Sequence, residues 1–352
     1  MLKICQCVRN FSPYGGMEGY VWNLAHKLVE ENVNVLVVCE EYHNDYNTKI
    51  QIKLVDKLNL NAPSWSKHLF FSQKVKKLFQ REKHLIGNYI IHSHERLSIH
   101  HVTTIHGPLI MDRKKSLLDF FSLRLFAWKF IEKREFFSHN VSFIFPNSYF
   151  SRNKLNYFYP NIKAAICAPG YPGINEDLYK IENKNEVFNI GFIGKEWKRK
   201  GLLFVIDVYR EIYKYKDNIH LHIAGVNQND VKKYLEGLSE NSYTFYGWTD
   251  SKTFFEKIEL ILHPAINEPF GMVLSEANAS GVYCLISENV GFKDFIGPNV
   301  GEVLALDKKL WVDSILKLIG KKVYVNRIQF SWLNLAKNHI KIYKIIDRLN
   351  NN

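Results

Sequence analysis

The sequence predicts an α/β protein with two domains, each built around a parallel sheet. At 352 residues the chain exceeds the size of one hydrophobic core. Apolar, strand-like runs alternate with amphipathic, helix-like segments, which is the pattern of βαβ units. The densest run of Pro and Gly, residues 168–173, lies between two such series and indicates a domain boundary.

We therefore place the first domain at residues 1–168 and the second at residues 169–331. The expected elements of the first domain are strands at residues 2–8, 33–39, 89–94, 102–108 and 142–148, and helices at residues 20–31, 64–83, 112–137 and 149–158. Those of the second domain are strands at residues 188–194, 219–225, 243–248, 260–262 and 282–287, and helices at residues 202–215 and 269–280. A last helix covers residues 332–352, with docking positions at Trp332, Ala336 and Tyr343.

The formal net charge of +12 is unevenly distributed along the chain. Residues 1–170 hold 23 basic against 13 acidic side chains, and residues 171–352 hold 24 against 22. The first half is thus expected to meet an anionic partner, and charge alone leaves nucleic acid and anionic lipid as candidates.

Two basic segments with apolar residues, 64–83 and 112–137, are candidates for the lipid contact. The second interleaves Trp, Phe and Leu with Lys and Arg, which is typical of a helix lying among lipid headgroups. A helix packed on the sheet with a solvated Lys face is the commoner explanation for residues 64–83. For residues 112–137, a helix buried between the sheet and a neighbour explains the composition equally well.

The composition predicts a cytoplasmic protein with reduced cysteines. No apolar run approaches the roughly 20 residues that span a bilayer, and no signal-peptide pattern follows the first residues. Five cysteines show no metal-like spacing, and most lie in apolar runs, which favours reduced core residues. They are Cys5, Cys7, Cys39, Cys167 and Cys284.

The stretch from 260 to 281 predicts a strand, a loop and a helix with an anion-binding mouth. Pro269 suits a first helical turn, and the backbone N–H groups of residues 270–272 would then face an anion. Glu268 precedes this helix and Glu276 lies within it. A solvated pair of Glu on a helix is the alternative interpretation.

Two other loops follow strands and precede helices. Gly15 and Gly16 lie in a Gly-rich loop where the backbone can approach a phosphate or a sugar, although a plain tight turn explains them as well. Residues 195–201 hold four cations, which favours a clamp for a diphosphate over a solvated charge run. No Asp-x-Asp occurs in the chain, so we expect that no metal is required.

Five histidines lie near the ends of the two strands at 89–94 and 102–108. A zinc site is disfavoured because neither Cys nor a Glu-x-x-His helix accompanies them. They are His92, His94, His100, His101 and His106.

In this order, the Gly-Gly loop, His106-Gly107, the loop with Lys195 and Lys200, and Glu268-x7-Glu276 resemble the motifs of the GT-B glycosyltransferases of family 4. The string 198–201, Lys-Arg-Lys-Gly, is similar to the lipopolysaccharide-core branch of that family. Lys195 departs from the family pattern because it stands where an Arg is usual.

The resemblance implies a GT-B fold, in which two Rossmann-like domains face a cleft and the last helix crosses back to the first domain. It implies catalytic roles for His106, Glu268 and Lys200. It also implies a donor site formed by Gly15, Gly16, Lys195, Lys200, Glu268, Pro269, Phe270, Gly271, Met272, Val273 and Glu276.

The implied activity is that of a retaining, metal-independent hexosyltransferase that uses a nucleoside-diphosphate sugar, with uridine favoured over guanosine, and no cofactor. The expected acceptor is lipopolysaccharide core or a lipid-linked glycan at the inner face of the cytoplasmic membrane, and no nucleic acid is expected to bind. Three alternatives stay open: a GT-B epimerase of nucleotide sugars, a phosphorylase, and a non-enzymatic basic protein that binds membranes or nucleic acid.

Overall fold

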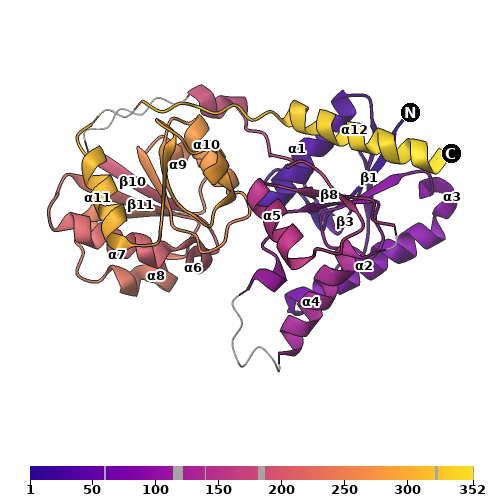
Figure 1. Cartoon of the computed structure of the whole chain (residues 1–352), viewed down its shortest axis with the longest axis horizontal. Helices are drawn as coiled ribbons and strands as arrows, with labels where there is room; N and C mark the ends of the chain where they lie inside the picture. Colours follow the sequence, from indigo (N-terminus) through magenta and orange to yellow (C-terminus); the bar gives the residue numbers. More distant parts are fainter. Residues whose placement is uncertain (59–60, 114–121, 139, 181–186, 322–323, 352) are drawn as a thin grey trace. The chain divides into compact units, whose positions relative to one another are not determined.

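The computed structural model describes residues 1–58, 61–113, 122–138, 140–180, 187–321 and 324–351. This part of the chain forms two compact units (Figure 1). Unit 1 combines Met1–Gly173 with Ser331–Asn352, and unit 2 is Ile174–Phe330. Both units contain parallel sheets with helices, so the predicted α/β class is confirmed.

The main sheet of unit 1 has seven strands in the order β5-β3-β1-β6-β7-β8-β9. The five inner strands are mostly buried, as parallel strands covered on both faces require, whereas the edge strands β5 and β9 are partly exposed. The strands are β1 (Lys3–Cys7), β3 (Asn34–Cys39), β5 (Gln51–Leu54), β6 (Ile90–Ser93), β7 (Val102–Ile105), β8 (Phe143–Pro146) and β9 (Ala165–Ile166). A separate two-stranded sheet pairs β2 (Asn10–Phe11) with β4 (Glu41–Tyr42).

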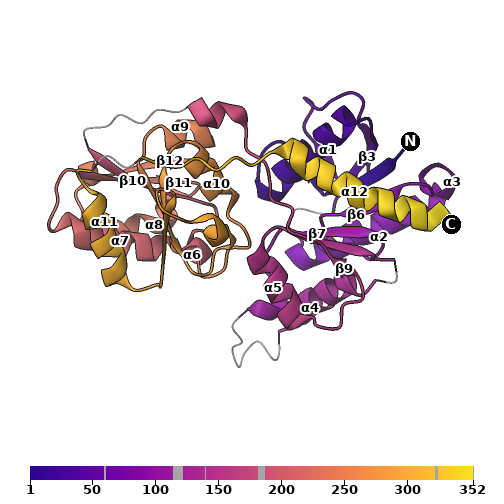
Figure 2. The same ribbon diagram turned by 45° about the horizontal axis from the view of Figure 1, so that its top comes forward.

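Helices lie on both sides of the main sheet of unit 1, with α1 and α12 on one side and α2 and α4 on the other (Figures 1 and 2). The helical segments are α1 (Gly16–Glu30), α2 (Ser64–Arg81), α3 (Lys83–Ile86), the 3₁₀ turn η1 (Ile110–Asp112), α4 (Leu123–Phe136), α5 (Tyr149–Phe158) and α12 (Trp332–Asn351). In the described part of the chain, no helix combines the length and apolar character that crossing a bilayer requires.

Unit 2 holds a six-stranded sheet in the order β12-β11-β10-β13-β14-β15. In Figure 1, α7 and α11 lie on one side of this sheet and α9 and α10 on the other. The strands are β10 (Phe188–Ile193), β11 (Ile219–Ala224), β12 (Tyr243–Gly247), β13 (Leu260–His263), β14 (Tyr283–Ser287) and β15 (Gly301–Leu304). The α-helices are α6 (Trp197–Lys200), α7 (Leu202–Tyr213), α8 (Gln228–Val231), α9 (Ser251–Phe255), α10 (Met272–Ala279) and α11 (Lys308–Leu318).

The described residues of unit 2 also form the 3₁₀ turns η3 (Glu176–Lys180), η4 (Lys232–Leu235), η5 (Glu240–Ser242) and η6 (Gly291–Phe295). The main core of the unit lies between its sheet and the pair α7 and α11, where Val205, Tyr209 and Trp311 are buried. This core fixes α7, whose first residue follows the cationic loop at 195–201.

The last helix, α12, packs on unit 1, as predicted. The proposed docking residues Trp332, Ala336 and Tyr343 are all buried there. The helix lies against α1, and the ring of Trp332 contacts the ring of Tyr20 at a centroid distance of 6.0 Å. Unit 1 is therefore completed by residues that follow unit 2 in the sequence.

The five cysteines, which we predicted to be reduced, are free thiols in the structure. Cys5, Cys7, Cys39 and Cys284 are buried, and Cys167 is partly exposed. Burial raises the pKa of Cys39 to about 12 and that of Cys167 to about 11, so both thiols stay protonated near neutral pH.

The two basic segments of unit 1 differ. In α2, Phe71, Val75 and Leu78 are buried while Lys76 and Lys77 face solvent, as expected for a helix packed on the sheet. The predicted helix at 112–137 is described from Leu123 to Phe136, and residues 114–121 lie outside the described part. There the inner face is buried, but apolar side chains also lie exposed on the outer face.

We expect that replacing Leu335 by Ala lowers the free energy of unfolding of unit 1 by about 2–5 kcal/mol, because this α12 side chain is only 3% exposed. Urea unfolding followed by circular dichroism measures the effect. Leu349→Ala is the matched control, since Leu349 lies exposed on the same helix. Equal losses in both variants would show that α12 is not docked through Leu335.

Candidate active site

The cationic loop of unit 2 lies against the loop between β13 and α10. Gly201 adopts a φ of 84°, and a side chain there would meet the carbonyl oxygen of Pro264 at 2.3 Å. The backbone N–H of Ile266 donates to the carbonyl of Arg199 over 3.0 Å. Glycine at 201 therefore allows the close approach that joins the two predicted motifs.

Glu268 lies at the centre of this contact and is buried. Its Oε2 atom lies 3.1 Å from Nη1 of Arg199, 3.7 Å from Nζ of Lys200 and 3.6 Å from Nε2 of His263. Burial alone would raise the pKa of Glu268, but the contact with His263 and the charges of Lys200 and Arg199 outweigh it. The pKa therefore lies well below its usual range and the carboxylate is ionised.

His263, at the end of β13, is fully buried beside this carboxylate. Burial lowers its pKa against the raising effect of Glu268, so the imidazole is neutral. Neither of its ring nitrogens has a hydrogen-bond partner within the described residues. The compensation for the Glu268 charge thus comes from Lys200 and Arg199.

The backbone around Glu268 is fixed by residues that follow β14. The N–H of Glu268 donates to the carbonyl of Asn289 over 2.9 Å, and the N–H of Gly291 donates to the carbonyl of Glu268 over 2.9 Å. These bonds form a short parallel bridge to Val290. The segment that follows β14 therefore supports the position of the carboxylate.

The prediction that Pro269 lies in the first turn of the next helix is wrong. The helix α10 begins at Met272, and Gly271 precedes it with a φ of 92°. Phe270 is buried before the helix, and its ring packs against Phe292, Phe295 and Phe330. Because Gly271 has a left-handed φ that a right-handed helix cannot contain, the helix starts after it, and the helix mouth shifts to Met272 and Val273.

Glu276 lies in α10, eight positions after Glu268. Its Oε2 atom accepts a hydrogen bond of 2.7 Å from the hydroxyl of Ser251. Burial raises the pKa of Glu276, whereas the bond from Ser251 and the charge of Lys200 lower it. Lys200 thus acts electrostatically on both carboxylates of the motif.

Lys195, which we predict to hold the diphosphate, is exposed. Its Nζ atom lies 4.3 Å from the centre of the Trp248 ring, a cation–π contact. Trp248 is 65% exposed and directly follows β12. Lys200, in contrast, folds back over Gly194, where an added Cβ would lie 2.4 Å from its Cδ atom.

Several residues of this site were not in the predicted set. Arg199 was seen only as one charge among four, and its contact with Glu268 depends on the one-turn helix α6. Ser251, Trp248 and His263 all lie at or after the carboxyl ends of strands of one parallel sheet. That position is the signal that could have identified them.

The remaining predicted residues, Gly15, Gly16 and His106, belong to unit 1. Gly15 has a φ of 105° and precedes α1, which begins at Gly16. One turn later, the ring of Tyr20 lies edge-on to the ring of His106 with centroids 4.9 Å apart. The Gly-rich loop and His106 are therefore joined by α1, each at a carboxyl end of the sheet.

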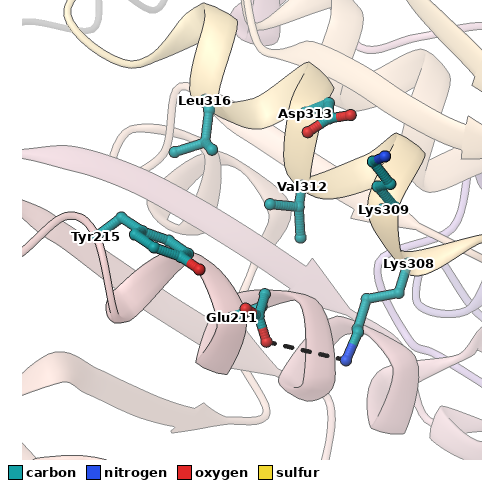
Figure 3. Close-up of a pocket in the computed structure, with 7 residues that line it drawn as sticks. All are labelled: Glu211, Tyr215, Lys308, Lys309, Val312, Asp313 and Leu316. Atoms are coloured by element: carbon teal, nitrogen blue, oxygen red, sulfur yellow. Dashed lines mark ion pairs between the residues drawn. The ribbon is translucent and has the colours of Figure 1, made fainter.

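A pocket of about 490 Å³ lies elsewhere in unit 2, between α7 and α11 (Figure 3). It contains none of the predicted site residues, and the ion pair of Glu211 and Lys308 crosses it at 3.9 Å. Across the described ranges, no three His, Cys, Asp or Glu side chains gather as metal ligands would.

The depressed pKa of Glu268 predicts a pH-dependent contribution to stability. The ionised carboxylate stabilises the fold above the pKa it has when unfolded, and this contribution is lost as the pH falls toward the folded-state value. We expect Glu268→Gln to lower the free energy of unfolding by roughly 1–3 kcal/mol near neutral pH, and by less near pH ~4.

Urea unfolding of wild type and variant across this pH range measures the difference. Glu196→Gln is the control, since Glu196 is exposed and also pairs with Arg199. A difference between wild type and Glu268→Gln that stays constant with pH would contradict an ionised, paired Glu268.

The chain matches two protein families over most of its length. Residues 14–177 match the family described as Glycosyltransferase Family 4, and residues 187–321 match the family described as Glycosyl transferases group 1. A protein of Methanocaldococcus jannaschii described as an uncharacterized glycosyltransferase is 29% identical over 174 residues, which are 44% of each chain. The chain therefore spans less than half the length of that relative.

A Klebsiella pneumoniae protein described as an uncharacterized 41.2 kDa protein in the cps region aligns more fully. It is 25% identical over 305 residues, which are 78% of this chain and 79% of that protein. This alignment includes residues of both units, so the K. pneumoniae protein is similar to the present chain across both domains.

Two solved structures share the fold. WaaG, a glycosyltransferase involved in lipopolysaccharide biosynthesis, superposes with a TM-score of 0.77 at 16% identity, covering 97% of this chain and 95% of that chain. HepE from Anabaena, in complex with UDP-glucose, gives a TM-score of 0.66 at 15% identity and full coverage of both chains. With both families matched in their proper order on this fold, the chain belongs to the group 1, family 4 glycosyltransferases of GT-B type.

Proposed function

We propose that the chain is a retaining hexosyltransferase that moves a sugar from a nucleoside diphosphate, with UDP favoured, to a saccharide acceptor. The observation that carries this proposal is the position of Lys200. Its ammonium lies 3.7 Å from Glu268, and its charge also lowers the pKa of Glu276, so one cation influences both carboxylates of the family motif.

In this proposal the diphosphate replaces a carboxylate as partner of the cations. Without a ligand, Arg199 and Lys200 neutralise Glu268. A diphosphate bound at the start of α10 would attract both cations and leave the Glu268 carboxylate to accept hydroxyl groups of the donor sugar. Glu276 would accept the ribose hydroxyls, and the exposed ring of Trp248 offers a stacking surface for the base.

The leaving diphosphate would be stabilised by Lys200, Arg199 and the backbone at the start of α10, so we propose that the reaction needs no metal. Retention at the anomeric carbon requires either a covalent intermediate or substitution on one face. In this proposal Glu268 accepts hydroxyl groups of the donor sugar and Glu276 those of the ribose, so neither carboxylate is assigned to attack the anomeric carbon. Attack on the front face, assisted by the departing phosphate, is the mechanism we propose.

Three of these relatives support the substrate classes. HepE was solved with UDP-glucose, which favours a uridine donor here. WaaG acts in lipopolysaccharide biosynthesis, and the K. pneumoniae relative is encoded in a cps region, which favour a cell-envelope saccharide as acceptor.

The decisive experiment measures release of nucleoside diphosphate from a panel of UDP- and GDP-sugars, with and without EDTA. We expect turnover of one donor in the presence of EDTA, and a fall of about 10²–10³-fold in kcat for Lys200→Ala and Glu276→Ala. Lys198→Ala is the matched control, because Lys198 is exposed in the same loop.

Other outcomes would redirect the assignment. Interconversion of two nucleotide sugars without transfer would identify an epimerase. Release that uses inorganic phosphate as acceptor would identify a phosphorylase. Absence of any donor turnover, even with membrane lipid extracts, would reject the transferase.

We also propose that α4 holds the enzyme on the inner face of the cytoplasmic membrane, where a lipid-linked acceptor is available. Leu123, Phe126 and Phe130 are 72%, 70% and 54% exposed and share one face of the helix. Exposed Lys133 adjoins this apolar stripe. Apolar side chains flanked by cations are what an anionic bilayer surface binds.

The inner face of α4 is fixed by buried charges, which keeps the stripe facing outward. Glu132 accepts hydrogen bonds from the N–H groups of Ile110 and Met111, at 2.6 and 3.2 Å, and pairs with Arg96 at 3.2 Å. Arg96 also lies 3.5 Å from Glu135. Rotation of the helix would leave these buried carboxylates without their partners.

We expect the double variant Phe126→Ser, Phe130→Ser to bind vesicles containing anionic phosphatidylglycerol about tenfold or more weakly than wild type. Sedimentation with sucrose-loaded vesicles measures the partition. Tyr157→Ser is the control, because Tyr157 is exposed on α5, outside the stripe. Unchanged binding of the double variant would remove α4 from the membrane contact.

A further inference from the structure

Six polar side chains form a hydrogen-bonded chain inside unit 1. They come from β1, from β6 and β7 with the residues that follow them, and from α12. All but His106 are buried. In the order in which they are hydrogen-bonded they are His106, His94, Gln6, Tyr343, His92 and Thr104.

The distances are those of good hydrogen bonds throughout. Nε2 of His106 lies 2.8 Å from Nδ1 of His94, and Nε2 of His94 lies 2.6 Å from Oε1 of Gln6. Nε2 of Gln6 donates to the hydroxyl of Tyr343 over 3.2 Å. His92 completes the chain, with Nδ1 2.6 Å from the Tyr343 hydroxyl and Nε2 2.8 Å from Oγ1 of Thr104.

Gln6 gives this chain a direction because its two ends have different chemistry. The carboxamide oxygen can only accept, so the proton of His94 is on Nε2. In a neutral imidazole the other nitrogen is then an acceptor, so Nδ1 of His94 receives the proton of Nε2 of His106. Beyond Gln6, its amide donates to Tyr343, Tyr343 to His92, and His92 to Thr104.

The histidines of this chain are neutral. Burial lowers the pKa of His94 well below its ordinary value, helped by His106 and His339. Burial and His339 lower the pKa of His106 to about 3. With one proton, held on Nε2, His106 keeps an unprotonated Nδ1, and this atom has no hydrogen-bond partner within the described residues.

We propose that Gln6 and His94 are positioning residues that fix His106 in its Nε2–H tautomer, so that Nδ1 accepts a hydrogen bond from a hydroxyl group of the transferred sugar. The proposal rests on the function proposed above and adds two residues to it. The backbone of His106 is held separately, since the amide of Asn147 donates to its carbonyl over 3.4 Å. The hydrogen-bond chain therefore selects the tautomer, and not only the place, of the ring.

The tautomer decides which sugars are accepted. An unprotonated Nδ1 requires a hydroxyl that donates, whereas a protonated Nδ1 requires a group that accepts. Replacing the contacted hydroxyl by fluorine removes the donor, so the wild-type enzyme should reject that analogue. A variant with the proton on Nδ1 should discriminate less.

The test begins with ¹⁵N NMR of the imidazole groups in the full, unliganded chain. The signals of His106 are identified by their loss in His106→Gln. We expect a protonated Nε2 and an unprotonated Nδ1 in wild type. In Gln6→Leu, Nε2 of His94 loses its acceptor, and we expect the proton of His94 to move to its own Nδ1. Nδ1 of His94 then donates to Nε2 of His106, so the proton of His106 must be on Nδ1 of His106.

Cys7→Ala is the matched control, because Cys7 is the next residue of β1 and packs in a different, apolar cluster. It should leave the His106 tautomer unchanged. A wild-type His106 with the proton on Nδ1 would overturn the proposal even if Gln6→Leu does not fold. An unchanged tautomer in a folded Gln6→Leu would overturn it as well.

Kinetics with UDP-glucose and its monodeoxyfluoro analogues form the second arm. We expect Gln6→Leu to lower kcat/KM for UDP-glucose by about 10- to 100-fold, and to lower the ratio between UDP-glucose and one fluoro analogue. An unchanged ratio for every analogue would overturn the contact with sugar. If wild type turns over no donor of the panel, the proposed function fails, whereas the NMR result still decides the tautomer.

Discussion

The ion pair between Glu268 and the two cations Lys200 and Arg199 is the interaction on which the site of unit 2 depends. A loop with four cations repels itself when no anion is bound. Glu268 supplies the missing negative charge from inside the protein, and its backbone is bonded on both sides to the segment after β14. The cations are thus held in place before a diphosphate arrives.

This arrangement joins three separate βα connections. The loop after β10 brings the cations, the loop after β13 brings Glu268, and the segment after β14 fixes its backbone. All three lie at the carboxyl ends of neighbouring strands, where parallel sheets place their ligand sites. Gly201 is required because the loops after β10 and β13 approach more closely there than a side chain allows.

Unit 1 uses a different device at the equivalent edge of its sheet. Besides ion pairs such as that of Arg96 with Glu132, its carboxyl edge and interior hold neutral histidines, Gln6 and Tyr343. Such a network costs little only when its buried polar atoms have partners, which the hydrogen bonds from Nε2 of His106 to Thr104 provide. Nε2 of His339 is an exception, since it is buried and has no partner in the described part of the chain.

Much of the fold could be predicted from sequence, because parallel strands are short apolar runs and helices carry a 3.6-residue period. The strands at Val102–Ile105 and Leu260–His263 and the docking of Tyr343 are examples. The start of α10 was mispredicted, because the left-handed φ of Gly271 keeps Pro269 and Phe270 out of the helix. The partners Arg199–Glu268 and Gln6–His94 could not be predicted, because each depends on contacts between segments far apart in sequence.

The position of α12 has a consequence for how the protein is made. Gly173 packs directly against Trp332, where an added Cβ would lie 2.3 Å from the backbone nitrogen, and Ile174 is bonded to Phe330. The sequence of unit 2 is therefore inserted into that of unit 1, and the two segments that connect the units lie side by side. On the ribosome, residues 174–330 emerge before α12 does, so unit 2 can fold first. The hydrogen bonds of Gln6 and His92 to Tyr343 can therefore form only after most of α12 has been synthesised.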